Sequence, residues 1–149
     1  MYDGLDDELK GTTYGKAVRL QIEFPRPEVG DRYYDYSAMD QNGDTMALSD
    51  VRGKYILLHF SSLACSGSQL SLPELKGLHN DHGDEVEIIS ISTDTDKGLW
   101  EDHVERDSIT WDYLWDGKGI YNDAYVKYWE MGTPNYVLIS PDKVILERW

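Results

Sequence analysis

The sequence predicts a single α/β domain built on a mixed sheet with helices on both faces. Three observations support this fold class. Residues 55–60 and 86–93 are apolar runs rich in branched and aromatic side chains, as in strands buried on both sides. Between them, leucines recur at helical spacing, which supplies the crossover that parallel strands need. Residues 136–149 hold two apolar runs around a Pro-Asp-Lys turn, which predicts a closing β-hairpin.

Length and charge limit the function classes. The 149 residues are enough for one domain with a substantial core. Asp and Glu outnumber Lys and Arg by 28 to 14, so the formal net charge of −14 disfavours nucleic acids and anionic lipids as partners. We interpret this excess as a source of solubility, with a basic partner surface as the alternative. No apolar run approaches the ~20 residues that cross a bilayer.

Residues 1–30 are predicted to be an extension and linker. The opening Met1-Tyr-Asp-Gly is unusual for a natural domain, so we expect a targeting segment and an upstream region before it. Residues 17–23 are interpreted as a strand. Pro25 and Pro27 forbid a helix or a central strand directly after it.

The domain proper is predicted to span residues 31–149 and to begin with a β-hairpin. Residues 33–39 and 45–48 flank Asn42-Gly43, and both turn residues tolerate the positive φ of a tight turn. The elements expected after it are strand 55–60, a helix ending between 78 and 82, strand 86–93, helix 96–106, an extended piece 109–115, helix 119–129, and strands 136–140 and 144–149. Asp94-x-Asp96 is expected to cap the second of these helices.

Cys65, the only cysteine, lies where the first buried strand is followed by a helix. The unpaired N–H groups of a first helical turn and the helix dipole both favour a thiolate there. A reactive nucleophile and a buried, inert cysteine are the two interpretations. One cysteine cannot form an internal disulfide, so cysteine counting does not fix the compartment.

The segment around Cys65 resembles the active site of thioredoxin-fold thiol–disulfide oxidoreductases, in particular their TlpA/ResA-like (redoxin) branch. That family has an apolar strand ending in Phe-Trp, then W-C-x-x-C, then a proline followed by Glu-Leu. Here Phe60 lies five residues before Cys65, and Pro73, followed by Glu-Leu, lies eight after it, at the family's spacing. Two positions depart from the family's pattern. Ser68 replaces the second cysteine, and Ala64 replaces the tryptophan.

The resemblance implies a thioredoxin-like fold and a reaction. A second cysteine would resolve a mixed disulfide from within the same molecule, and a serine cannot do this. Cys65 is therefore expected to act as the sole nucleophile, with a thiol- or disulfide-bearing protein or a small thiol such as glutathione as partner. The resemblance implies the bacterial periplasm or cell envelope as the location, with the cytoplasm as an alternative. The family's C-terminal helix would follow Trp149, so we expect either a longer chain or residues 1–30 over that surface.

The resemblance also assigns the other site residues. His59 stands six residues before Cys65, where thioredoxin-like proteins commonly carry an acid. It is interpreted either as a proton relay or as a half-buried strand histidine bonded to a backbone group. Ser68 is expected to hydrogen-bond the sulfur. Thr133-Pro134 resembles the cis-proline loop, which presents backbone groups to an extended substrate. The expected substrate-binding residues are Ala64, Ser66, Gly67, Thr133 and Pro134.

Several alternatives stay open. Ser68 marks a natural monothiol enzyme, a degenerate site that only binds peptides, or an engineered replacement. Ser62-x-x-Cys65 echoes the peroxiredoxins, but Leu58 stands where they need a proline, so a peroxidase is a minor alternative. The pair His79 and His82 offers too few ligands for a metal site, and no cofactor is expected.

Overall fold

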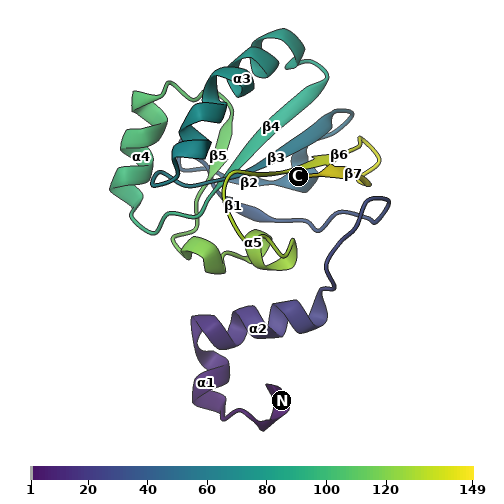
Figure 1. The fold of residues 1–149 in the computed structure, drawn as a ribbon, viewed down its shortest axis with the longest axis vertical. Helices are drawn as coiled ribbons and strands as arrows, with labels where there is room; N and C mark the ends of the chain where they lie inside the picture. Colours follow the sequence, from purple (N-terminus) through teal and green to yellow (C-terminus); the bar gives the residue numbers. More distant parts are fainter. Residues whose placement is uncertain (1) are drawn as a thin grey trace.

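A five-stranded mixed sheet forms the centre of the computed structural model, which describes residues 2–149 (Figure 1). The strand order is β5-β4-β3-β6-β7. Strands β3, β4 and β5 run parallel to one another, and β6 and β7 pair antiparallel. Their bounds are β3 Tyr55–Ser61, β4 Val86–Ser92, β5 Asp112–Leu114, β6 Asn135–Ile139 and β7 Ile145–Arg148.

Helices cover both faces of this sheet, so the predicted fold class is confirmed. On one face lie α3 (Ser66–His82) and α4 (Lys97–Arg106), the crossovers that follow β3 and β4 (Figure 1). On the other lie the short helix α5 (Asp123–Lys127) and the 3-10 turn Gly119–Tyr121 before it. The helix predicted over residues 119–129 is therefore split in two.

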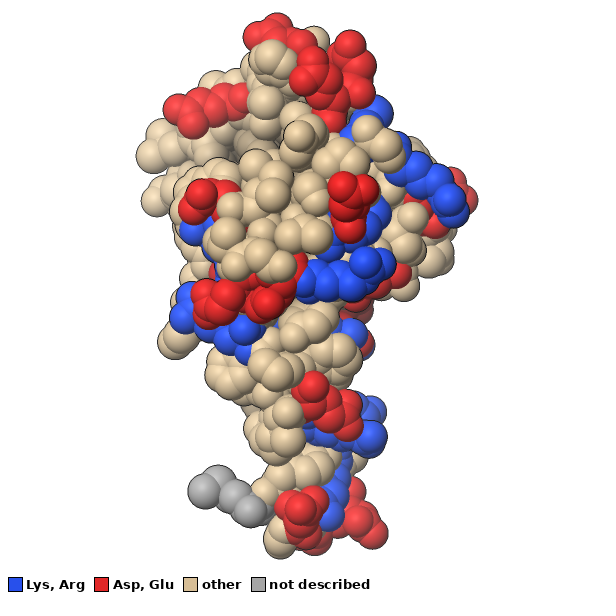
Figure 2. Space-filling view, turned by 90° about the vertical axis from the view of Figure 1, so that its right-hand side faces the viewer, with Lys and Arg blue, Asp and Glu red and all other residues tan. Residues whose placement is uncertain are grey.

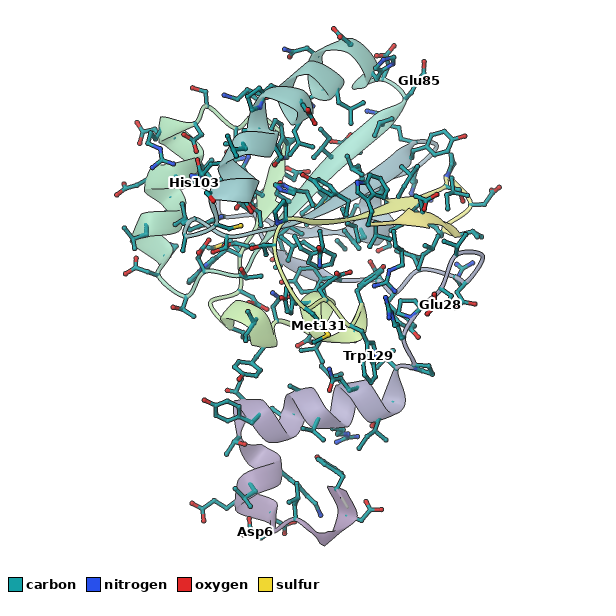
Figure 3. The ribbon with its side chains drawn as sticks, viewed as in Figure 1. Asp6, Glu28, Glu85, His103, Trp129 and Met131 are labelled. Atoms are coloured by element: carbon teal, nitrogen blue, oxygen red, sulfur yellow. The ribbon has the colours of Figure 1, made fainter. Side chains whose placement is uncertain are left out.

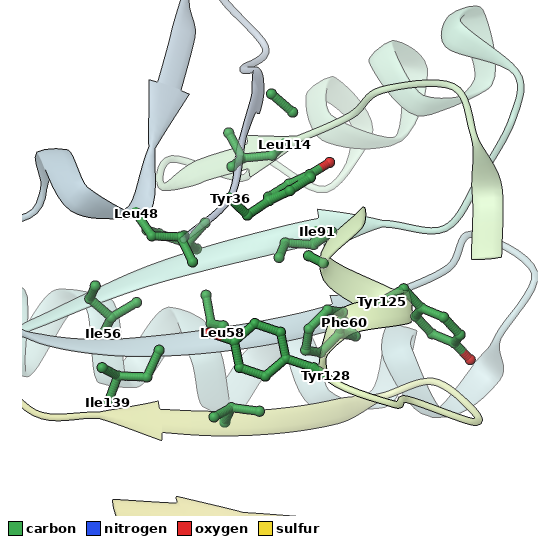
Figure 4. Packing of buried hydrophobic residues seen from close by; sticks show 14 of the residues in the cluster. Tyr36, Leu48, Ile56, Leu58, Phe60, Ile91, Leu114, Tyr125, Tyr128 and Ile139 are labelled. Atoms are coloured by element: carbon green, nitrogen blue, oxygen red, sulfur yellow. The ribbon is translucent and has the colours of Figure 1, made fainter. Parts of the chain in front are cut away.

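Alternation along β3 divides the core between the two faces. Ile56, Leu58 and Phe60 point toward α5 and are fully buried with Tyr128 (Figure 4). Leu57 points toward α3 and joins a second cluster whose other large members are Leu72, Leu75, Ile88, Trp100, Trp111 and Tyr113. Trp111 and Tyr113, which follow α4, are therefore part of the core.

The predicted hairpin around Asn42-Gly43 is present but shorter than expected. Strand β1 (Ser37–Met39) pairs with β2 (Thr45–Ala47), and Gly43 has a φ of 86°. A 3-10 turn (Leu48–Asp50) follows and buries Leu48 completely.

The strand predicted over residues 17–23 is wrong, because this segment lies in helix α2 (Thr13–Glu23), after a one-turn helix α1 (Asp7–Gly11). Thr12 caps α2, since its hydroxyl accepts a hydrogen bond from the Gly15 amide at 3.1 Å. On α2, Tyr14 packs edge-on against Tyr121 with ring centroids 4.9 Å apart. Helix α2 therefore contacts the domain through Tyr14 and buries Gly15 and Ala17.

The part of the extension that the structure describes, residues 2–30, does not cover the sheet beside α3. Helix α2 packs against α5, on the opposite face, and the extended segment around Pro25 and Pro27 leads from it into the domain (Figure 1). The indole N–H of Trp129 holds this segment by donating to the Phe24 carbonyl at 2.9 Å. Beside α3, a groove lined by apolar residues that include Leu75, Tyr136 and Trp149 remains open. The expectation that the extension covers this surface is therefore wrong.

Charges of both signs share the surface drawn in Figure 2, where basic side chains lie beside acidic ones. Arg26 and Glu28 approach to 3.8 Å, and the largely buried pair Arg148 and Glu130 to 3.1 Å. Acidic side chains collect at the upper end of this view, the end at which Figure 3 labels Glu85. Among the helices of residues 2–149, none is long and apolar enough to cross a membrane.

Candidate functional site

Cys65 occupies the N-cap position of α3 and is half-buried. Strand β3 ends at Ser61, and a tight turn follows in which the Cys65 amide donates to the Ser62 carbonyl at 3.2 Å. Ala64 and Ser66 on either side are exposed. The thiol therefore lies at the end of the sheet, flanked by residues that solvent and a partner can reach.

The loop before β6 faces this thiol. The thiol donates to the Thr133 carbonyl, with sulfur and oxygen 2.9 Å apart, and the Thr133–Pro134 peptide bond is cis. Gly67, in the first turn of α3, lies directly against the proline. A Cβ at Gly67 would stand 2.9 Å from Pro134 Cδ and 3.6 Å from the Cys65 sulfur. The fold thus brings together four of the predicted site residues: Cys65, Gly67, Thr133 and Pro134.

The pKa of the Cys65 thiol lies below its ordinary value. The largest cause is a hydrogen bond from the Thr133 side chain, followed by one from the Ser68 backbone amide. The Ser68 hydroxyl and the Gly67 amide add to this effect, and partial burial opposes it. All these donors are uncharged, so the site favours a thiolate through placed hydrogen bonds at a helix N-terminus.

Ser68 lies beneath the sulfur and is almost fully buried. Its oxygen also accepts a hydrogen bond from the Ser62 amide at 3.4 Å. The side chain at the position of the family's second cysteine therefore links the turn before Cys65 to the first turn of α3.

His59 is fully buried rather than half-buried, and its partner is a side chain rather than a backbone group. Its Nδ1 lies 2.9 Å from the Ser90 hydroxyl, which also accepts from the Trp111 indole at 2.9 Å. Its ring stacks on Tyr136 with centroids 5.2 Å apart. Burial, and secondarily the charge of His103, lower the pKa of His59 to about 4. At neutral pH this ring is uncharged, with Nε2 unpartnered within residues 2–149.

Asp94 is a site residue that sequence reasoning assigned to another role. Only Asp96 caps α4, by accepting from the Leu99 amide at 2.9 Å. Asp94 instead accepts from the Leu63 amide at 3.0 and 3.1 Å and from the Ser62 hydroxyl at 3.1 Å. No local pattern identifies this contact, because the partners lie 31 and 32 positions apart in the chain.

The described residues contain no group of three or more His, Cys, Asp or Glu side chains placed to hold a metal ion. The ring of His79 packs against Trp111, with centroids 5.7 Å apart. On α4, His103 faces α3, and its Nδ1 lies 2.7 Å from Asp107 and 3.4 Å from Gln69 (Figure 3).

Comparison with known proteins places this geometry in a family. The model of the AhpC/TSA family matches residues 29–148. The chain belongs to the AhpC/TSA family. The chain is similar to thioredoxin-like protein YneN of Bacillus subtilis, with 25% identity over 119 residues, 78% of this chain and 68% of that protein. It is also similar to probable glutathione peroxidase 8-B of Xenopus laevis, with 36% identity over 64 residues, 43% of this chain but only 30% of that protein.

Solved structures that resemble this AhpC/TSA-family chain have a thioredoxin-like fold. The thioredoxin domain of a thiol-disulfide oxidoreductase from Bacteroides vulgatus superposes with a TM-score of 0.76 at 26% identity, covering 81% of this chain and 87% of that one. A thiol-disulfide oxidoreductase from Bacteroides fragilis gives 0.73 at 26% identity, with coverages of 79% and 89%. The chain is therefore a thioredoxin-like, TlpA-like redoxin, and the resemblance noted in the sequence is confirmed.

Proposed function

We propose that this redoxin exchanges thiols and disulfides through Cys65 alone. The Cys65 thiolate attacks one sulfur of a partner disulfide, forms a new S–S bond to it, and expels the other sulfur as a thiolate. An external thiolate then attacks the mixed disulfide, takes over the partner sulfur and releases Cys65 as a thiolate. The electron pairs balance in each step, and the external thiol supplies the reducing equivalents.

One observation carries this proposal. A half-exposed sulfur lies at the N-terminus of α3, where uncharged donors from Thr133, Ser68 and Gly67 lower its pKa. An inert structural cysteine would be buried among apolar side chains, with a raised pKa. The exposed Ala64 and Ser66 leave room for a partner chain beside the sulfur. We assign these two residues, with Gly67, Thr133 and Pro134, to partner binding.

Ser68 determines the lifetime of the intermediate. Its hydroxyl donates to the sulfur but neither ionises near neutral pH nor forms a disulfide. The mixed disulfide therefore persists until an outside thiol arrives. A thiol- or disulfide-bearing protein, or glutathione, could serve both as the partner disulfide and as the thiol that releases Cys65. We propose the cell envelope as the place of action, on the basis of the family resemblance.

The test is the capture of a mixed disulfide. We expect the reduced protein, mixed with oxidised glutathione, to gain one glutathionyl group by mass spectrometry, and Cys65→Ser to gain none. In Ser68→Cys the adduct should decay at least about a hundredfold faster at micromolar free thiol, because a tethered thiol has a millimolar or higher effective concentration.

The same experiment separates the alternative function. If Cys65 gains no adduct and alkylates at the pH of an ordinary thiol, the domain is a redox-inactive peptide-binding module. If the Ser68→Cys adduct persists as long as that of the wild-type protein, the resolving role assigned to position 68 is wrong.

A further inference from the structure

The turn that carries Cys65 is held from the neighbouring strand by one carboxylate. Asp94, just after β4, accepts the Leu63 amide with both oxygens, at 3.1 Å for Oδ1 and 3.0 Å for Oδ2. Oδ1 also accepts the Ser62 hydroxyl at 3.1 Å, and Oδ2 the Ser92 hydroxyl at 2.9 Å. Both oxygens are therefore occupied by donors, three of the four contacts coming from the turn.

Two hydrogen bonds inside the turn connect this anchor to Cys65. The Ser62 hydroxyl, which donates to Asp94, accepts from the Ala64 amide at 3.2 Å. The Ser62 carbonyl accepts from the Cys65 amide at 3.2 Å. Ser62 is thus the link through which the position of Asp94 fixes the backbone of Cys65.

Asp94 is itself held in place. Its amide donates to the Ser92 hydroxyl at 3.1 Å, and its carbonyl accepts from the Trp115 indole at 2.9 Å. Beside it, Thr93 donates through its amide to the Ser61 carbonyl at 2.9 Å. Since parallel strands end at the same edge of a sheet, these bonds join the ends of β3 and β4 into one support.

We propose that Asp94 is a positioning residue for Cys65, whose carboxylate fixes the Ser62 turn and so keeps the sulfur within reach of Thr133 and the first-turn amides of α3. This inference rests on the proposed reactivity of Cys65. It assigns Asp94 no contact with the reacting atoms, because the carboxylate acts through Ser62 and Leu63.

The charge of Asp94 and its positioning role predict effects of opposite sign. A negative charge near a thiolate disfavours it, so removing the charge alone would make Cys65 more reactive. Loss of position would move the sulfur away from its donors and make it less reactive. The other ionisable groups on the elements around α3 and the 131–134 loop include His59, His103, Arg106, Asp107, Glu130 and Arg148. Helix α3 itself carries Glu74 and Lys76, and α4 carries the exposed pair Lys97 and Glu101, 3.4 Å apart. Burial lowers the pKa of His59 and His103, so neither gains a charge near pH 7.

The experiment measures the rate of Cys65 alkylation by iodoacetamide against pH. For Asp94→Asn we expect a profile displaced to higher pH and a rate about three- to tenfold lower at pH 7, which lies within the roughly two- to thirtyfold range that loss of a helix-terminal interaction gives. Ser62→Ala removes the side-chain part of the link, the hydroxyl contacts to Asp94 and to the Ala64 amide, without changing any charge, and we expect a smaller displacement in the same direction. Asp96→Asn is the matched control. It removes a carboxylate two positions away that caps α4, and we expect its profile to match the wild type.

Each outcome decides the inference. A faster Asp94→Asn reaction at pH 7 means that charge dominates, and an unchanged profile with a lower melting temperature means a purely structural role. Either result overturns it. Should Asp94→Asn fail to fold, an unchanged profile for Ser62→Ala overturns it as well. A wild-type profile equal to that of a free thiol refutes the proposed function instead, since that measurement involves no variant.

Discussion

Replacing Gly67 with alanine tests the contact between α3 and the cis-proline loop. The added methyl carbon would stand 2.9 Å from Pro134 Cδ, closer than carbon atoms pack, and the proline ring cannot rotate away. Overpacking of this kind costs about 1–3 kcal/mol. Alanine in place of glycine within a helix returns up to about 1 kcal/mol. We therefore expect Gly67→Ala to lower the free energy of unfolding by about 0–3 kcal/mol.

Gly77→Ala, in the same helix, supplies the control. A Cβ at Gly77 meets no atom within 4 Å outside the helix's own backbone, so this variant should gain about 0.5–1 kcal/mol from helix propensity alone. The difference between the two variants then isolates the contact with Pro134, about 1–3 kcal/mol. Urea unfolding of the wild-type protein and both variants measures it, with equal m-values as the check on two-state behaviour.

The same substitution should change the chemistry of the site. If the methyl group pushes the loop away, Thr133 moves from the sulfur, and Cys65 alkylation shifts to higher pH in Gly67→Ala but not in Gly77→Ala. Equal stabilities for the two variants, together with a wild-type alkylation profile in Gly67→Ala, would refute the tight contact on which this reasoning depends.

Two further predictions concern buried ionisable groups. The unfolded chain binds a proton on His59 near pH 6.5 and the folded chain only near pH 4, so the folded state should lose up to about 3 kcal/mol as the pH falls between these values. His59→Gln should lack this part of the pH dependence in urea titrations at pH 7, 5 and 4, and identical curves for both proteins would contradict the assignment. Glu130 and Arg148 pair at 3.1 Å with little exposure, so Glu130→Gln, which removes one partner of a buried pair, should cost about 1–3 kcal/mol, the value for a lost hydrogen-bond partner. Arg148 keeps its hydrogen bonds to backbone carbonyls in that variant, and a loss below 0.5 kcal/mol, about the value of an exposed pair, would show that the pair contributes little.

Local patterns were sufficient for most of the fold. The hairpin at Asn42-Gly43 and the buried strands β3 and β4 have side chains that favour one conformation by themselves. The side chains of residues 17–23 fit either conformation. Val18, Leu20 and Ile22 alternate with polar residues as in a strand, whereas Ala17 and Val18 are also compatible with one face of a helix. Packing against α5 and the cap at Thr12, which lies before the segment, decide in favour of the helix.

Motif spacing along the chain predicts the part of the site around Cys65, but not the contacts that come from distant loops and strands. Cys65, Gly67 and Pro134 meet as the family's spacing implies. The role of Asp94 depends on two loops that meet only when β3 and β4 lie side by side, so the sequence alone assigned it to the adjacent helix. His59 lies on β3, but it is fully buried and its partner Ser90 lies across the sheet on β4, a contact that spacing along the chain does not reveal.

Because Cys65 is the one cysteine of this sequence, the protein can be labelled at a single site without mutagenesis. A maleimide fluorophore or a nitroxide spin label can attach only at Cys65, with no background site to remove by mutagenesis. A nitroxide at the start of α3 would sit beside the loop around Pro134, so its spectrum should broaden when a peptide occupies the surface between them. Occupancy of that surface then becomes measurable by paramagnetic resonance even when no disulfide is exchanged.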